Sequence, residues 1–174
     1  MNIKIELISE PDLADESFNI VINGLKPRET YRVEMYLTDY YCINAPMLLA
    51  HDILWKSTAT FVSDTNGIIN ISQTPSCSGS YEGISTMGLF FNAKPLTNKR
   101  KKLPNSLSKI PLLDHFFVGI KIMQGNTVIA ERTFTRHYMS SQISHKDIYG
   151  RYFQGRLFYD KKAIKTPSID YCER

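Results

Sequence analysis

A chain of 174 residues with 43% hydrophobic and 22% charged residues is able to bury a core of ordinary size, which excludes an intrinsically disordered protein. It has no apolar run of the roughly 18 residues that a membrane-spanning helix needs, and its first residues alternate between apolar and polar instead of forming a signal peptide. The three cysteines, Cys42, Cys77 and Cys172, have no paired spacing, which argues against a disulfide framework and a zinc site. We therefore expect a cytoplasmic protein without a membrane or metal partner.

Alternating or continuous apolar residues, bounded by turn residues, predict strands along most of the chain. Nine ranges have such a pattern: 2–8, 17–23, 30–38, 49–62, 68–72, 87–91, 114–123, 127–136 and 152–159. The run from Met87 to Phe91 is continuously apolar with a glycine inside it, and we expect it to be a central strand buried on both faces. Trp55 is the expected large anchor of the core.

Two turn signals predict how neighbouring strands pair. Asn66-Gly67 tolerates the positive φ of a tight turn, so the short strand after it should pair back onto the strand before it. Gln124-Gly125-Asn126 separates two strongly alternating runs and predicts a hairpin.

The remaining segments give little sign of helix. Residues 139–147 are polar and are expected to connect to the last strand, and residues 161–174 form a charged tail. No stretch repeats apolar residues with a helical period over a convincing length. We expect an all-β protein, an immunoglobulin-like antiparallel β-sandwich of about seven to nine strands with very little helix, formed by residues 1–160.

The titratable residues form no recognisable catalytic motif. Four histidines and 17 acidic residues are present, but none lies in a metal-binding, phosphate-binding or nucleophile signature. Cys77 in a Ser-Cys-Ser-Gly cluster could act as a nucleophile with His137 or His145 as its base, but no helix N-terminus is present to activate the thiol, and we interpret the cluster as a turn. The residues thus predict no catalytic, cofactor-binding or metal-binding side chain.

The net charge of +4 is concentrated between residues 94 and 109. Lys99, Arg100, Lys101 and Lys102 are consecutive and are called the basic cluster below. Proline, asparagine and serine around them predict a solvated loop, and a patch for an anionic ligand is the alternative. Because no aromatic residues are interleaved with the cluster, we do not expect nucleic acid as a partner.

Residues 79–95 carry the pattern Gly-x-Tyr-x-Gly-x-x-x-Met-Gly-Leu with Lys-Pro downstream. This pattern resembles the N-terminal domain of the acyl-CoA thioesterases and bile acid-CoA:amino acid N-acyltransferases. Other features agree with that family in order along about residues 1–160: Asp15-Glu16 before Phe18, Asn23-Gly24-Leu25-Lys26-Pro27, Trp55 before Asn66-Gly67, and Gly155-Arg156-Leu157-Phe158.

The resemblance implies a sandwich followed by an α/β-hydrolase domain that holds the nucleophile, acid and histidine. None of those three maps onto this chain, so we expect a non-catalytic accessory domain, with residues 161–174 as the tail or stump of a missing hydrolase domain. That domain would be the partner and would alone meet acyl-CoA, with Tyr81, Met87 and the basic cluster as candidate contacts with it or with a ligand. Apolar surface left exposed without it would favour self-association. The alternative is an independent immunoglobulin-like module for a protein or an anionic ligand.

Overall fold

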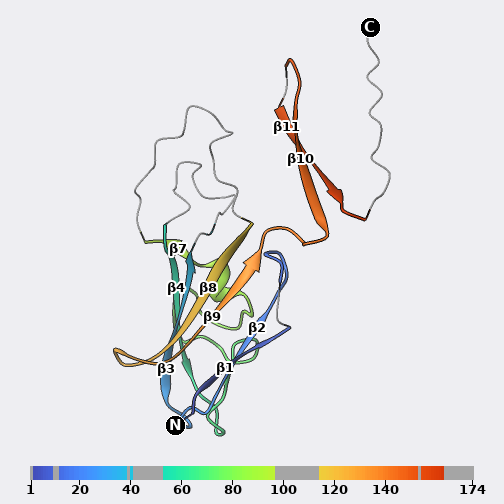
Figure 1. The fold of residues 1–174 in the computed structure, drawn as a ribbon. Helices are drawn as coiled ribbons and strands as arrows, with labels where there is room; N and C mark the ends of the chain where they lie inside the picture. The colour runs from blue at the N-terminus through green and yellow to red at the C-terminus, as the bar shows by residue number, and fades with distance from the viewer. Residues whose placement is uncertain are drawn as a thin grey trace. The chain divides into compact units, whose positions relative to one another are not determined.

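Figure 1 shows a computed structural model of the chain, which describes residues 2–9, 12–38, 40, 53–96, 114–152 and 154–162. These residues belong to two compact units, Met1–Tyr138 and Met139–Arg174. The first unit contains two β-sheets and the second contains a β-hairpin, and all the named strands pair antiparallel. The described chain is therefore all-β, as predicted.

The smaller sheet of the first unit has three strands in the order β1-β2-β5. Their bounds are Lys4–Ile8 for β1, Asn19–Asn23 for β2 and Ile69–Asn70 for β5. Side chains of β1 and β2 alternate between buried and less buried, as the period of two in the sequence predicts. One face of this sheet is thus apolar and needs a partner layer.

The larger sheet supplies that layer, with strands in the order β6-β4-β3-β8-β9 and with β7 also paired to β4. The bounds are Thr30–Thr38 for β3, Trp55–Val62 for β4, Ser78–Gly79 for β6, Lys94–Pro95 for β7, His115–Gln124 for β8 and Thr127–His137 for β9. The predicted hairpin of β8 and β9 is confirmed, with Gly125 at a φ of 60° in its turn.

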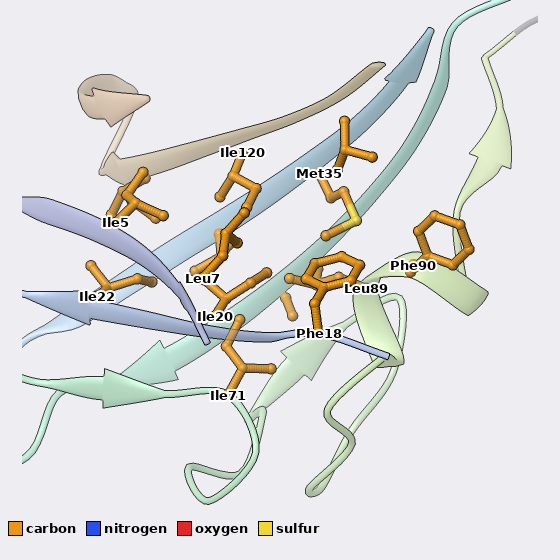
Figure 2. Packing of buried hydrophobic residues seen from close by; sticks show 14 of the residues in the cluster. Ile5, Leu7, Phe18, Ile20, Ile22, Met35, Ile71, Leu89, Phe90 and Ile120 are labelled. Carbon is orange, nitrogen blue, oxygen red and sulfur yellow. The ribbon is translucent and has the colours of Figure 1, made fainter. Parts of the chain in front are cut away.

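The inward faces of the two sheets share one hydrophobic core. Ile5 and Ile20 of the smaller sheet belong to the same buried cluster as Met35 and Ile120 of the larger sheet (Figure 2). Trp55 is buried in this cluster, which confirms it as a large core anchor. The first unit is therefore a β-sandwich, since two apolar sheet faces bury each other.

The turn at Asn66-Gly67 exists, but the pairing predicted for the strand after it is wrong. β5 pairs with β2 of the smaller sheet and not with β4. Gly67 has a φ of 72°, and its carbonyl accepts a hydrogen bond of 3.0 Å from the Leu25 backbone N–H. This bond holds the turn against the residues that follow β2. The chain consequently crosses from one sheet to the other and is not folded back as a hairpin.

The second unit contains β10, Ile143–Tyr149, paired with β11, Gln154–Asp160. The sequence predicted the strand at 152–159 but interpreted residues 139–147 as a polar connection, which is wrong from Ile143 onward. The reason is that the four polar residues among the seven of β10 are divided between its two faces, so that no alternation marks it. Only its register with β11 identifies it as a strand.

One helix lies among the described residues, the single turn α1 from Gly88 to Phe91. The prediction of a central strand at 87–91 is therefore wrong, although the prediction of very little helix is confirmed. No helix in the described ranges is long and apolar enough to cross a bilayer.

Candidate functional site

The residues that carry the family pattern, 79–95, are called the motif segment, and both of its ends are bound to β4. In β6, Gly79 pairs with Ala59, and in β7, Pro95 pairs with Trp55. The other side of β4 is occupied by β3, so β6 and β7 lie along the same edge of β4. They are two pieces of one edge strand that is interrupted by residues 80–93.

This interruption explains why the apolar run forms a helix. The three residue steps of β4 from Ala59 to Lys56 cover about 10 Å. Residues 80–93, which connect the partners of those two positions, would span about 46 Å if extended. The chain must therefore fold back on itself, and a helical turn shortens it while directing its apolar residues toward the core. The apolar sequence pattern indicated that these residues are buried. It did not indicate that both ends of the segment pair with β4.

The glycines of the motif segment allow close backbone and ring contacts. Gly79 has a φ of 124°, and a Cβ atom there would collide with the Thr58 carbonyl oxygen. A Cβ on Gly88 would lie only 2.5 Å from the Tyr81 ring, so that ring packs directly on the backbone at the start of α1.

Tyr81 is half-buried and is fixed at both of its polar ends. Its hydroxyl donates a hydrogen bond of 3.4 Å to the Ser85 carbonyl, and its own carbonyl lies 3.0 Å from the hydroxyl of buried Ser76. Burial raises the pKa of Tyr81 to about 12. The phenol therefore stays protonated near neutral pH and donates its hydrogen bond to the Ser85 carbonyl.

The helix α1 divides its apolar side chains between the core and the surface. Leu89 and Phe90 are buried in the core (Figure 2), and so is Met87 just before the helix. Phe91, in contrast, is 76% exposed. Two further apolar side chains of this region, Ile84 at 61% and Leu96 at 58%, are also exposed. The region thus has a buried apolar side and exposed apolar side chains.

A buried arginine joins the motif segment to the start of the chain. Arg136 of β9 is fully buried, and its guanidinium lies 4.9 Å from the Phe18 ring centre and 5.2 Å from the Phe90 ring centre. Its Nη2 donates hydrogen bonds to the carbonyl oxygens of Leu13 and Glu16. Aromatic faces and carbonyl oxygens are favourable surroundings for a guanidinium cation. Arg136 therefore stabilises the contact between residues 13–18 and α1.

Sequence reasoning missed the role of Arg136, although a signal was present. In β9, Phe134 and Arg136 lie at alternate positions, and their partners in β8 are Val118 and Phe116, which are both buried. An arginine in the inward register of a strand must find polar partners inside the protein. Burial lowers the pKa of Arg136, and the charge of nearby Glu16 acts in the opposite direction.

The outward face of the larger sheet carries a compact charge network around Glu34. Its carboxylate lies 3.0 Å from the Lys56 Nζ and 3.1 Å from the Arg32 Nε, and the Tyr36 hydroxyl donates to it. Burial alone would raise the pKa of Glu34, but these three neighbours together hold it below its ordinary value. The negative charge of the carboxylate is consequently balanced by its two cationic neighbours, and these ion pairs stabilise the sheet.

The structure places the predicted site residues unevenly. Tyr81 and Met87 both belong to the packed motif segment, while the basic cluster lies outside the described residues. Cys77 is an exposed free thiol just before β6, His137 faces Asp12, and His145 lies against Phe158. Among the described residues, no group of three or more histidine, cysteine or acidic side chains is arranged to hold a metal ion.

The fold and the motif segment define a class of protein, an antiparallel β-sandwich domain in which a packed connection interrupts an edge strand. Comparison with protein families identifies the family within this class. Residues 15–149 match the family described as the acyl-CoA thioester hydrolase/BAAT N-terminal region, and the chain belongs to that family. The family expected from the sequence is thus confirmed.

Several mouse (Mus musculus) proteins are similar to parts of the chain. Acyl-coenzyme A amino acid N-acyltransferase 2 is 27% identical over 110 residues, which cover 62% of this chain and 24% of the relative. Acyl-coenzyme A amino acid N-acyltransferase 1 is 30% identical over 93 residues, or 52% of this chain and 20% of the relative. Acyl-coenzyme A thioesterase 6 is 23% identical over 160 residues, or 89% and 35%. The chain therefore spans between a fifth and about a third of the length of these relatives.

Proposed function

We propose that this chain is the non-catalytic accessory domain of an acyl-CoA thioesterase or N-acyltransferase. Its role is to dock on a hydrolase domain that performs the chemistry on the acyl-CoA thioester, in the cytoplasm. The observation that carries this proposal is the match of residues 15–149 to the N-terminal region of that family. The mouse relatives are named as acyl-CoA thioesterases and N-acyltransferases and are about three to five times as long as their matched parts.

The packing of the motif segment supports a docking role. Glu82 and Lys94 are separated by eleven residues without a formal charge. Within this uncharged run, Phe91 and Ile84 expose most of their side chains, although the neighbouring apolar residues are buried. Exposed aromatic and aliphatic side chains without charges beside them resemble the centre of a protein interface. A hydrolase domain is the partner that we propose for this surface, and the family assignment supports this choice.

Acyl-CoA turnover by the purified chain is the direct test of the non-catalytic role. Release of free CoA thiol from acyl-CoA should not exceed the background rate, with mouse acyl-coenzyme A thioesterase 6 as the active control. A saturable rate that survives further purification would overturn the proposal. The locus that encodes the chain gives a second test, because a serine or cysteine elbow followed by a histidine should be encoded downstream.

Self-association of the isolated chain tests the docking surface. If Phe91 is part of that surface, sedimentation should show association at high concentration that Phe91→Ser weakens. Val128→Ser is the matched control, because Val128 is also an exposed apolar residue, at 45%, but lies in β9. A chain that stays monomeric at all concentrations, or two variants that behave alike, would argue against docking through the motif segment.

A further inference from the structure

Two histidines face each other where β8 begins and β9 ends. His115 is the first residue of β8, and it pairs directly with His137, the last residue of β9. The Tyr138 N–H donates a hydrogen bond of 2.9 Å to the Asp114 carbonyl, so the pair next to the histidines is a hydrogen-bonded pair. His115 and His137 are therefore a non-hydrogen-bonded pair, the kind that brings opposite side chains closest together in an antiparallel sheet.

The two imidazole rings are close enough to share a ligand. Their centres are 5.8 Å apart, and their planes are inclined by 53°. Two imidazoles on one tetrahedral zinc ion have ring centres about 5 Å apart, because each zinc–nitrogen bond is about 2.0–2.1 Å long. Both rings are partly exposed, so a small side-chain rotation is able to close the difference. The site is also open to entry of an ion from solvent.

Each histidine also has a carboxylate beside it. Asp114 Oδ1 lies 2.5 Å from the Nδ1 of His115, which places that N–H against the carboxylate and leaves Nε2 free to bind an ion. Asp12 Oδ1 lies 3.6 Å from the Nε2 of His137, and the Asp12 carbonyl accepts a 2.7 Å hydrogen bond from the His137 backbone N–H. A carboxylate that orients a histidine ligand as Asp114 does is a common feature of zinc sites and strengthens the binding, whereas Asp12 at 3.6 Å adds a negative charge nearby.

We propose that His115 and His137 supply the two protein ligands of a binding site for one divalent cation of the zinc class, with Asp114 as the carboxylate that orients His115 and Asp12 as a further negative charge nearby. Imidazole nitrogens suit Zn²⁺, Ni²⁺ and Cu²⁺ better than Mg²⁺ or Ca²⁺. Water completes the coordination, because only two side chains supply nitrogen ligands. The bound ion joins the ends of β8 and β9 and, through Asp12, the segment that Arg136 also holds.

Titration of the untagged chain with zinc chloride tests the site. Calorimetry at pH 7.5, with a reductant that does not bind metals, should show saturable binding of one zinc ion per chain. His115→Asn and His137→Asn should each weaken the affinity at least tenfold, and Asp114→Asn should weaken it by a factor on the order of ten. His145→Asn is the matched control, because His145 lies in β10, and it should leave the affinity unchanged.

Electron paramagnetic resonance with Cu²⁺ identifies the ligands. The unmodified chain should give couplings to two imidazole nitrogens, and His137→Asn should give coupling to one. Circular dichroism verifies that the variants are folded. If a histidine variant does not fold, Asp114→Asn still tests the site, because it changes a highly exposed side chain. The proposal is overturned if no saturable zinc binding is found or if the double variant His115→Asn/His137→Asn binds as tightly as the unmodified chain.

Discussion

Replacement of Gly88 by alanine tests the packing of the motif segment most directly. The added Cβ would lie 2.5 Å from the Tyr81 ring, a separation at which one group has to move. The ring cannot move freely, because it is half-buried and its hydroxyl donates to the Ser85 carbonyl. Overpacking of this kind costs about 1–3 kcal/mol. Alanine also gains up to about 1 kcal/mol over glycine in a helix, so we expect a net loss of up to about 2 kcal/mol.

The same change in a chain that lacks the ring should have the opposite sign. In Tyr81→Ala the overpacking is removed, and only the helix preference of alanine remains. Gly88→Ala should then be neutral or stabilising by up to about 1 kcal/mol. A double-mutant cycle built from these four chains should therefore give a coupling of about 1–3 kcal/mol between the two positions.

Urea denaturation followed by tryptophan fluorescence measures these differences. Trp55 is the single tryptophan of the chain and is buried in the core, so its signal reports on the first unit alone. The midpoint should shift without a change in the denaturant slope. If Gly88→Ala has the same effect with and without the Tyr81 ring, the ring does not pack on this glycine and the reasoning fails.

Three further predictions concern the rest of the core and its charges. Leu89→Ala should cost about 2–5 kcal/mol in urea denaturation, whereas Phe91→Ala should stay within about 0.5 kcal/mol, because the first side chain is buried and the second is exposed. Arg136→Ala should cost on the order of 3 kcal/mol, since it empties a buried volume and removes two hydrogen bonds; a neutral effect would contradict its role. Glu34→Gln should cost about 1–3 kcal/mol at pH 7. Because the pKa of Glu34 is held below its ordinary value of 4.5, its stabilisation is present above that pH and is lost as the pH falls through the lowered pKa, so the two chains should converge in acid.

The sequence was sufficient for elements whose stability is local. β3 has the predicted bounds, because one of its faces is buried in the core and the other is less buried, and its residues alternate accordingly. The hairpin of β8 and β9 was predictable because Gly125 marks its turn and both strands are long. In such elements the alternation of apolar residues and the turn residues can both be recognised from residues that are adjacent in the sequence.

The sequence was insufficient where distant pairing decides the structure. Residues 87–91 are apolar in either a strand or a helix, and the choice depends on β6 and β7 both binding to β4. The partner of β5 depends on the contact of Gly67 with Leu25, which is not visible in the run of residues itself. For the candidate site, Tyr81 and Met87 were named in advance, but the exposed Phe91 was not, because one apolar run gave no sign of its two sides.

The residues that carry the family pattern act mainly on packing, and this limits what the pattern says about activity. Gly79 permits pairing with β4, Gly88 accepts the Tyr81 ring, and Leu89 fills the core. Any chain with these residues at this spacing is expected to form the same packed connection between β6 and β7, whichever partner it binds. Differences between partners should therefore reside in side chains that the packing leaves free, above all Phe91. This separation predicts that exchanges at exposed positions of the segment change association without changing stability.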